Sequence, residues 1–209
     1  MILSAVTLSD VPELLHEMHC ALVDYPLARG VLSRIAATLP FVEGPDIALS
    51  QKPEHHRQAV ALLARFGLGA ADHAPEQGVT WDGGFVTIRM EPSVIIHEVA
   101  HYQLAPPSRR FAVDFGLGAG PESGDKRAGE AARQIFGVDC DREEARASLL
   151  GILWEAELLQ PAILAFLEQN WLEGGASRRN LDHLVTVADT LAAQGFITAD
   201  GRPTTRLQP

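Results

Sequence analysis

The chain has 209 residues, of which 46% are hydrophobic and 21% charged, so it is long enough to enclose one hydrophobic core, and we expect a single domain over residues 1–198. Its formal net charge of -10 argues against a nucleic-acid partner, because phosphate binding needs a basic surface. An acidic chain would instead attract a basic protein or peptide.

The apolar runs are too short for a membrane-spanning helix, which needs about 20 residues, so we expect no membrane partner. Residues 1–6 lack the basic region of a signal peptide. Cys20 and Cys140 are the only cysteines, too few for a disulfide framework. These features together predict a cytoplasmic protein.

The first half of the chain predicts helices and one hairpin. Apolar residues recur at helical spacing over residues 11–22 and 53–66, the second helix ending at Gly67. Strand-favouring residues flank the turn signal Asp82-Gly83-Gly84, which predicts a β-hairpin within residues 78–90. Pro92 opens a helix over residues 92–104 that Pro106 stops.

The second half adds further helices. Four glycines and a proline predict a loop over residues 117–124, and the tail over residues 199–209 is expected to be loose. Helical patterns cover residues 126–136, 141–159, 161–171 and 178–194. The predicted fold class is therefore mostly α (α+β), a single helical domain with a small β-hairpin next to the helix over residues 92–104.

A metal-binding pattern lies on that helix. His97 and His101 are four residues apart, so their imidazoles stand one turn above each other on the same face and can hold one divalent transition metal ion. Glu98 lies between them and is the candidate catalytic residue, as a general acid or base. The alternative is a pair of hydrogen-bonded core histidines.

Two histidines leave a metal under-coordinated, so a third protein ligand is expected downstream. Glu144 is the preferred candidate, because small residues near it would let its helix approach another closely. Glu143 and Glu122 are the alternatives. Asp141 and Glu144 also match a capping box, which would turn the Glu144 carboxylate back onto its own helix.

The segments His97-Glu98-Val99-Ala100-His101-Tyr102, Ser108-Arg109-Arg110 and Asp114-Phe115-Gly116 together resemble the core of the elongation factor P hydroxylase family. That family carries a His-Glu-x-x-His-aromatic segment followed by Arg-Arg and Asp-Phe-Gly at the same offsets. A weaker similarity over residues 144–154 lines up with the helix that bears the family's carboxylate ligand. The resemblance thus implies that His97, His101 and Glu144 are the metal ligands.

The chain also departs from that family. The family has Trp at the position of Tyr102, and an aromatic-rich run where Leu117-Gly118-Ala119-Gly120 follows here. These departures leave the identity of the substrate open even where the metal site is shared. Three residues are candidates for supporting the ligands or the substrate: Asp114 could accept a ring N–H of a ligand histidine, while Arg110 and Tyr102 have packing or ion pairing as alternatives.

The same ligands fit two kinds of enzyme. Fe(II) held by two histidines and one carboxylate is typical of oxygenases, and the resemblance favours hydroxylation of a modified lysine on a protein such as elongation factor P. Zn²⁺ held the same way, with Glu98 as general base, is typical of metallopeptidases and amidases. A non-catalytic metal-binding module is the third interpretation, and it would have no open coordination position.

Overall fold

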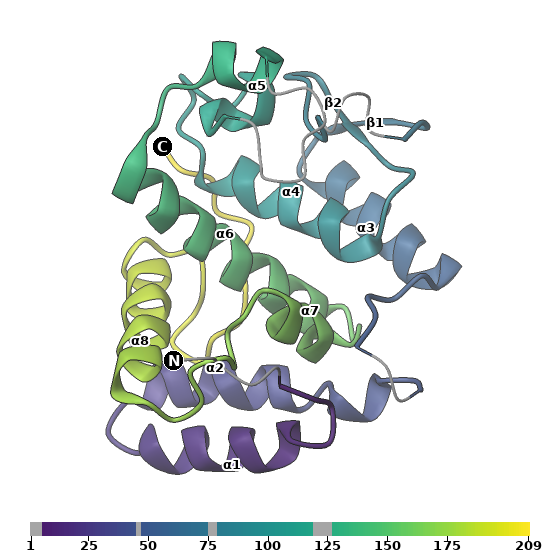
Figure 1. Ribbon diagram of the computed structural model, residues 1–209. Coiled ribbons are helices and arrows are strands. Elements are labelled where there is room, and N and C mark those ends of the chain that lie inside the picture. The colour runs from purple at the N-terminus through teal and green to yellow at the C-terminus, as the bar shows by residue number, and fades with distance from the viewer. Residues whose placement is uncertain (1–5, 45–46, 75–78, 119–126) are drawn as a thin grey trace. The chain divides into compact units, whose positions relative to one another are not determined.

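The computed structural model describes residues 6–44, 47–74, 79–118 and 127–209. Eight α-helices and a two-stranded sheet make up the regular structure of these residues, which confirms the mostly helical fold class (Figure 1). None of the described helices combines the length and the apolarity that crossing a bilayer requires. The chain folds as two compact units, one formed by Met1–Ser50 with Ile152–Thr204 and the other by Gln51–Gly151 with Thr205–Pro209.

The first unit is helical. It contains α1 (Val11–Ala21), α2 (Pro26–Ala36), the 3-10 helix η1 (Leu39–Phe41), α7 (Ala162–Glu168) and α8 (Arg178–Ala193). Helix α2 packs against α1, α7 and α8, and the residues buried in this unit include Val11, Met18, Val31, Ile35, Leu184 and Leu191. Ser177 begins α8 by accepting the N–H of Asn180 at 3.4 Å, an ordinary N-cap. The helix α2 is an addition to the helices expected from the sequence.

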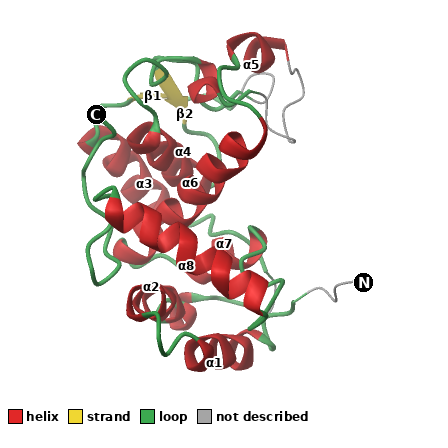
Figure 2. Cartoon of the chain, turned by 90° about the vertical axis from the view of Figure 1, so that its left-hand side faces the viewer, coloured by secondary structure: helices red, strands yellow, loops and turns green. Residues whose placement is uncertain are grey.

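The second unit carries the histidine motif. It contains α3 (Pro53–Arg65), β1 (Gly69–Ala71), β2 (Phe85–Thr87), α4 (Pro92–Leu104), the 3-10 helix η2 (Val113–Gly116) and α5 (Arg127–Ala132). Helix α6 (Gly137–Glu157) contributes its residues up to Gly151 to this unit. Helix α3 packs against α4, and β2 also contacts α4, so the small sheet lies next to the histidine helix as expected (Figures 1 and 2).

The sheet differs from the predicted hairpin in its pairing. The turn itself forms, because the Asp82 carboxylate accepts the N–H groups of Gly84 and Phe85 at 2.8 and 2.7 Å. It brings Trp81 and Val86 together as an antiparallel bridge. The ladder of β2, however, is parallel and joins it to β1, with Ala70 opposite Val86. Figure 2 shows this strand pair.

Helix α4 is enclosed on most sides. Pro92 stands in its first turn, where a missing N–H costs nothing, and the helix ends before Ala105 and Pro106. Ten of its 13 residues are buried, including Glu98 and His101. A polar side chain on such a helix needs a specific partner, since burial without one is costly. The buried polar side chains of this helix are those of Ser93, Glu98, His101 and Gln103.

The ends of two predicted helices shift for identifiable reasons. Helix α5 stops at Ala132, well before the expected residue 136, because the N–H groups of Gln134 and Ile135 donate to the carbonyl of Gly116 at 2.7 and 3.2 Å. Helix α6 begins at Gly137, four residues before the predicted start at Asp141. Both Asp141 and Glu144 thus lie inside the helix and not at its N-terminus.

The expectation of a loose tail over residues 199–209 is wrong. The N–H of Gln208 donates to the carbonyl of Gln103 at 2.8 Å, and the Gln103 amide donates to the carbonyl of Arg206 at 2.9 Å. Arg110 donates to the carbonyl of Gln208 at 2.7 Å. Backbone groups of the last residues are therefore tied to the end of α4 and to the segment that follows it.

Candidate metal centre

The three predicted ligands come together in the second unit. The Nε2 atoms of His97 and His101 on α4 lie 2.9 Å apart, so without an ion the two rings are within hydrogen-bond distance, as in the alternative of paired core histidines, and both Nε2 atoms can reach one ion. Glu144 on α6 reaches the same point, with its Oε2 atom 3.4 Å from Nε2 of His101 and 3.7 Å from Nε2 of His97. Among the described residues these are the only three histidine, cysteine or carboxylate side chains grouped in this way.

The close approach of α6 to α4 depends on small residues. A Cβ atom built on Gly151 would lie 3.4 Å from Cα of His97, so the backbones of the two helices nearly touch there. Ala147, one turn before Gly151, is fully buried. Because the residues at this contact are small, α6 lies close enough to α4 for the Glu144 side chain to reach the two histidines.

The donor atoms suit a transition metal ion. A triangle with sides of 2.9, 3.4 and 3.7 Å has a point about 2 Å from every corner, which matches zinc–ligand bonds of about 2.0–2.2 Å. Two neutral imidazole nitrogens and one carboxylate oxygen are also a common donor set for such ions. Three protein ligands leave further coordination positions open, and the half-exposed Glu144 side chain lies at the accessible side of the group.

The alternatives for the third ligand can be compared directly. Glu143 points elsewhere, because its Oε2 atom accepts a hydrogen bond from Arg109 at 2.5 Å. A capping role for Glu144 is wrong, because α6 begins at Gly137 and Glu144 stands two turns inside it. Glu122 lies outside the described residues. The geometry therefore favours Glu144 as the carboxylate.

Glu98 is a buried carboxyl group one residue from His97. Its Oε1 atom accepts a hydrogen bond from the hydroxyl of Thr80 at 2.8 Å. Burial raises the pKa of Glu98 above its usual range, although the nearby charges of His101 and His97 oppose this effect. A buried carboxyl group with a raised pKa keeps its proton to a higher pH than an exposed one, which suits it to donate or accept a proton at a catalytic site.

Asp114 occupies a strained turn beside the histidines. Residues 114–116 all have left-handed backbones, with φ values of 44° at Asp114, 53° at Phe115 and 73° at Gly116. Such conformations cost roughly 1–3 kcal/mol for residues other than glycine, so other contacts must hold them. One such contact is the N–H of Asp114, which donates to the carbonyl of Trp81 at 3.0 Å.

The Asp114 carboxyl group does not take the role expected for it. Burial raises its pKa to about 6, while hydrogen bonds from the backbone N–H groups of Trp81 and Thr80 act in the opposite direction. The Nδ1 atoms of His97 and His101 are both buried and have no hydrogen-bond partner among the residues described. Asp114 therefore contacts the backbone of residues 80–81 and influences His101 through its charge alone.

The turn also brings an aromatic ring onto a ligand. Phe115 stacks on His101 with 5.6 Å between ring centroids and 19° between planes, and Trp81 stacks on the other side of Phe115 at 5.3 Å. Tyr102 meets Trp81 edge to face at 6.1 Å. Tyr102 thus belongs to the aromatic packing of the site, and its hydroxyl makes no hydrogen bond that involves the three ligands among the described residues.

Arg110 lies further from the ligands than expected. Its guanidinium donates to the carbonyls of Ala105 and Gln208 at 3.1 and 2.7 Å, and it lies over the ring of Tyr102 at 5.2 Å. It forms no ion pair with Asp114 in the part of the chain that the structure describes, because the segment between them is not one regular helix. The neighbouring Arg109 is the arginine that contacts α6.

Three residues of the site were missed by the sequence analysis in this role: Thr80, Arg109 and Phe115. Arg109 and Phe115 stand within the Arg-Arg and Asp-Phe-Gly segments, so the spacing of those segments was the available signal. Thr80 had no local signal, because it meets Glu98 only through the fold.

The protonation of the ligands predicts a pH effect. Although burial lowers the pKa of His101, the Glu144 carboxylate raises it to about 9, and the same pairing lowers the pKa of Glu144. In the ion-free protein, stabilisation from His101 is therefore complete below its ordinary pKa of 6.5 and is lost as the pH rises toward about 9. Stabilisation from Glu144 is present above its ordinary pKa of 4.5 and is lost at lower pH.

A bound metal reverses the dependence on His101, because it must displace the proton. We expect the rise in thermal midpoint caused by Zn²⁺ to be larger at about pH 8 than at about pH 6. Differential scanning fluorimetry with Zn²⁺ and with a chelator measures this difference. A rise that is larger at the lower pH would contradict ligation by His101.

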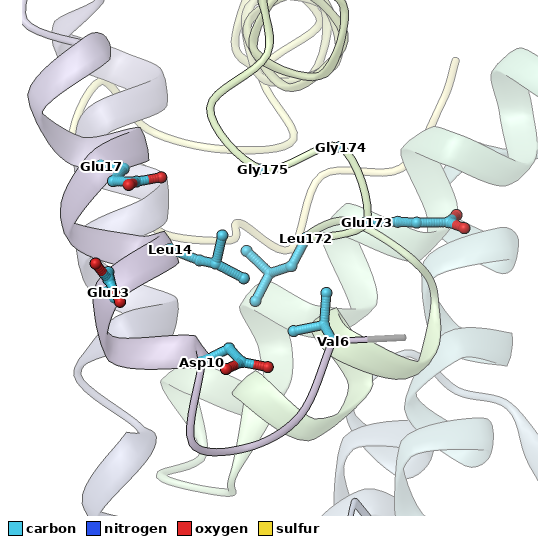
Figure 3. Close-up of a pocket in the computed structure, with 9 residues that line it drawn as sticks. All are labelled: Val6, Asp10, Glu13, Leu14, Glu17, Leu172, Glu173, Gly174 and Gly175. Atoms are coloured by element: carbon cyan, nitrogen blue, oxygen red, sulfur yellow. The ribbon is translucent and has the colours of Figure 1, made fainter. Parts of the chain in front are cut away.

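A separate pocket of about 470 Å³ lies in the first unit (Figure 3). Leu14 and Leu172 lie between Glu13 and Glu17 of α1 on one side and Glu173 on the other. No histidine or cysteine is among the described residues that line it, so it lacks the nitrogen and sulfur donors that transition metals favour. Of the described residues, the group on α4 and α6 is therefore the better candidate for a metal site.

Comparison with protein-family models, with curated proteins and with solved structures gave no match for this chain. The side chains around His97, His101 and Glu144 are therefore the observations from which a function can be proposed.

Proposed function

We propose that the protein is a metal-dependent hydroxylase whose Fe(II) ion is held by His97, His101 and Glu144. The observation that supports this proposal is the convergence of two imidazole nitrogens and one carboxylate oxygen on a single point. Two histidines and one carboxylate with open positions are typical of non-haem Fe(II) oxygenases. When bound there, Fe(II) supplies the positions at which O₂ and substrate are brought together.

The protein residues around the ligands suggest the kind of substrate. Glu98 and Asp114 are acidic and lie beside the histidines, while the buried guanidinium of Arg109 is paired with Glu143. The local field therefore favours a cationic group over an anionic one. This supports a lysine-derived side chain on a basic protein, such as elongation factor P, as the substrate. Cys20 and Cys140 are both free thiols, which suits an enzyme of the reducing cytoplasm.

In this proposal Glu98 handles protons near the reacting centre. Its buried carboxyl group accepts a hydrogen bond from the Thr80 hydroxyl and stands one residue after His97 in the sequence. Phe115 and Trp81 form an apolar wall behind His101 that keeps water from that side of the ring.

Metal analysis of protein purified without added metal and without oxygen tests the proposal. The expected result is stoichiometric iron, together with gain of one oxygen atom by a lysine-bearing protein substrate that depends on O₂ and on an added two-electron reductant, with the second oxygen atom released as water. Mass spectrometry of intact substrate measures that gain. Iron-free protein with stoichiometric zinc would contradict it.

The second candidate is a zinc-dependent peptidase or amidase. The arrangement of Glu98 directly after the first of two histidines four residues apart favours it, because in zinc metallopeptidases a glutamate at that position is the general base. In such an enzyme Zn²⁺ lowers the pKa of a bound water. Stoichiometric zinc with cleavage of a peptide or amide substrate would rank this function first.

Either function predicts the same effect of Glu98→Gln. We expect the variant to keep its metal, because Glu98 is not among the three converging ligands, and to lose activity by about 10²- to 10⁴-fold, the usual contribution of a general acid or base. Metal content by atomic absorption and turnover of the same samples measure the two effects. Glu54→Gln, at an exposed position of α3, is the matched control. Loss of metal from Glu98→Gln would make Glu98 a ligand.

A further inference from the structure

One buried guanidinium joins the two segments that flank the metal ligands. Arg109 is 9% exposed, and its Nη1 atom donates to the carbonyl of Phe115 at 2.6 Å. Its Nη2 atom donates to Oε2 of Glu143 at 2.5 Å, and Glu143 is 3% exposed. Two donors of one rigid, planar group thus bind the strained turn at residues 114–116 and helix α6 at the same time.

Each of the two residues that accept a hydrogen bond from Arg109 either contacts a proposed metal ligand or adjoins one in the sequence. Phe115 stacks on the ring of His101, and Glu143 is the residue before Glu144 on α6. Glu144 has a side chain that is 48% exposed, so packing around the side chain itself holds it only weakly. The position of its carboxylate therefore depends on how the first turns of α6 are anchored.

The left-handed turn at residues 114–116 also depends on the guanidinium of Arg109. Phe115 is a bulky residue with a φ of 53°, a conformation that only surrounding contacts can maintain. The hydrogen bond from Arg109 to the Phe115 carbonyl is one of these contacts. If it is lost, the peptide is free to leave the left-handed region, and the ring would move off His101.

We infer that Arg109 is a positioning residue, which holds His101 and Glu144 at the separation that one metal ion requires. The inference rests on the proposed metal site and adds a residue that touches none of the ligands. The neighbouring Arg110 offers a contrast, because its contacts among the described residues are with Ala105, Gln208 and Tyr102, none of which lies on α6.

The test must separate positioning from stability. Removing Arg109 alone would leave Glu143 buried with an unpaired charge, which by itself destabilises a fold. The double variant Arg109→Met/Glu143→Leu replaces both members by apolar groups of similar volume, a change that folds commonly tolerate. It removes the anchor without leaving a buried charge. Arg110→Met is the matched control.

The measurement is Co²⁺ binding to the full chain, followed by the ligand-field absorption of the bound ion and by the thermal midpoint of the ion-free protein. We expect the double variant to bind Co²⁺ about 10- to 100-fold more weakly than the wild type, the usual effect of losing a group that orients a ligand. Its absorption bands should change as well, because the separation of His101 and Glu144 changes. Arg110→Met should keep the wild-type affinity and spectrum.

A purely structural role would give another result. The double variant would then have an altered thermal midpoint but the affinity and absorption bands of the wild type, and this result would overturn the inference. The single variant Glu143→Gln provides a second test that keeps a hydrogen-bond acceptor for Arg109, and we expect it to bind Co²⁺ more tightly than the double variant. If the wild type itself binds no Co²⁺, the metal site fails as a whole, which is distinct from failure of Arg109 alone.

Discussion

Replacing either His97 or His101 by alanine is expected to abolish stoichiometric metal binding and the activity that depends on it. The two Nε2 atoms lie 2.9 Å apart and supply two of the three protein donors. Losing one leaves a site with two donors, too few to offset the dehydration of the ion. Metal content after dialysis against metal-free buffer, measured by mass spectrometry, gives the effect directly.

The control for these variants is His73→Ala. His73 is an exposed histidine of the same unit, and its ring contacts only the neighbouring carbonyl of Ala74 among the described residues. It should keep one metal ion per chain. Full metal content in both His97→Ala and His101→Ala would show that the ion is bound elsewhere, and both the site and the proposed function would be wrong.

Glu144→Ala is expected to remove most of the stabilisation that metal gives the fold, while the ion-free protein stays folded. A ligand at 100 times its dissociation constant stabilises a protein by about 2.7 kcal/mol, and that gain falls as the affinity falls. The ion-free protein loses the pairing of Glu144 with His101, but it should stay folded, since the Glu144 side chain is half-exposed and no cap is lost. Thermal midpoints with Zn²⁺ and with a chelator measure both effects.

Two other glutamates serve as controls for Glu144→Ala. Glu143→Ala leaves the guanidinium of Arg109 buried without its partner, so it should destabilise the ion-free protein by about 3–5 kcal/mol. It should weaken metal binding less than Glu144→Ala does, because it removes the anchor of a ligand and not the ligand itself. Glu122→Ala should retain the full metal-dependent shift. If Glu122→Ala alone abolishes that shift, the third ligand lies in the segment between Gly118 and Arg127, and Glu144 is not a ligand.

The helices were predictable from sequence where apolar periodicity agreed with a start or stop signal. Helix α4 has Pro92 at its start and Pro106 just beyond its end, and its predicted bounds agree with the structure. Helix α2 has Tyr25 at its N-cap with no capping hydrogen bond, and Gly30 in its interior, so local signals for it are weak. Packing against α1, α7 and α8 supplies what these local signals lack.

The parallel pairing of the small sheet could not be predicted from the sequence. Strand β1 is Gly-Ala-Ala, which has little strand preference of its own, and it is a strand because β2 pairs with it. A Cβ on Gly69 would lie 2.5 Å from the ring of Phe85, so this close parallel approach depends on glycine there. Such pairing is a property of the fold and has no signature in either segment alone.

The residues of the candidate site likewise include some that sequence spacing could select and some that only the fold identifies. Spacing along one helix was enough to select His97, Glu98 and His101, because helical geometry alone places two of them on one face. Choosing Glu144 over Glu143 needed the orientation of α6, which follows from Gly151 and from the start of the helix at Gly137. The anchoring by Arg109 depends on contacts 6 and 34 residues away, which sequence periodicity does not report.

The attachment of the last residues to α4 has a practical side for anyone producing this protein. Both backbone groups of Gln208 are engaged, its N–H by Gln103 and its carbonyl by Arg110. Any sequence joined after Pro209 would follow this attachment by a single residue, so a short flexible linker there would keep the bonds of Gln208 undisturbed. Proteolytic trimming of Thr205–Pro209 during storage would release the same end and expose the carbonyl of Gln103 to solvent.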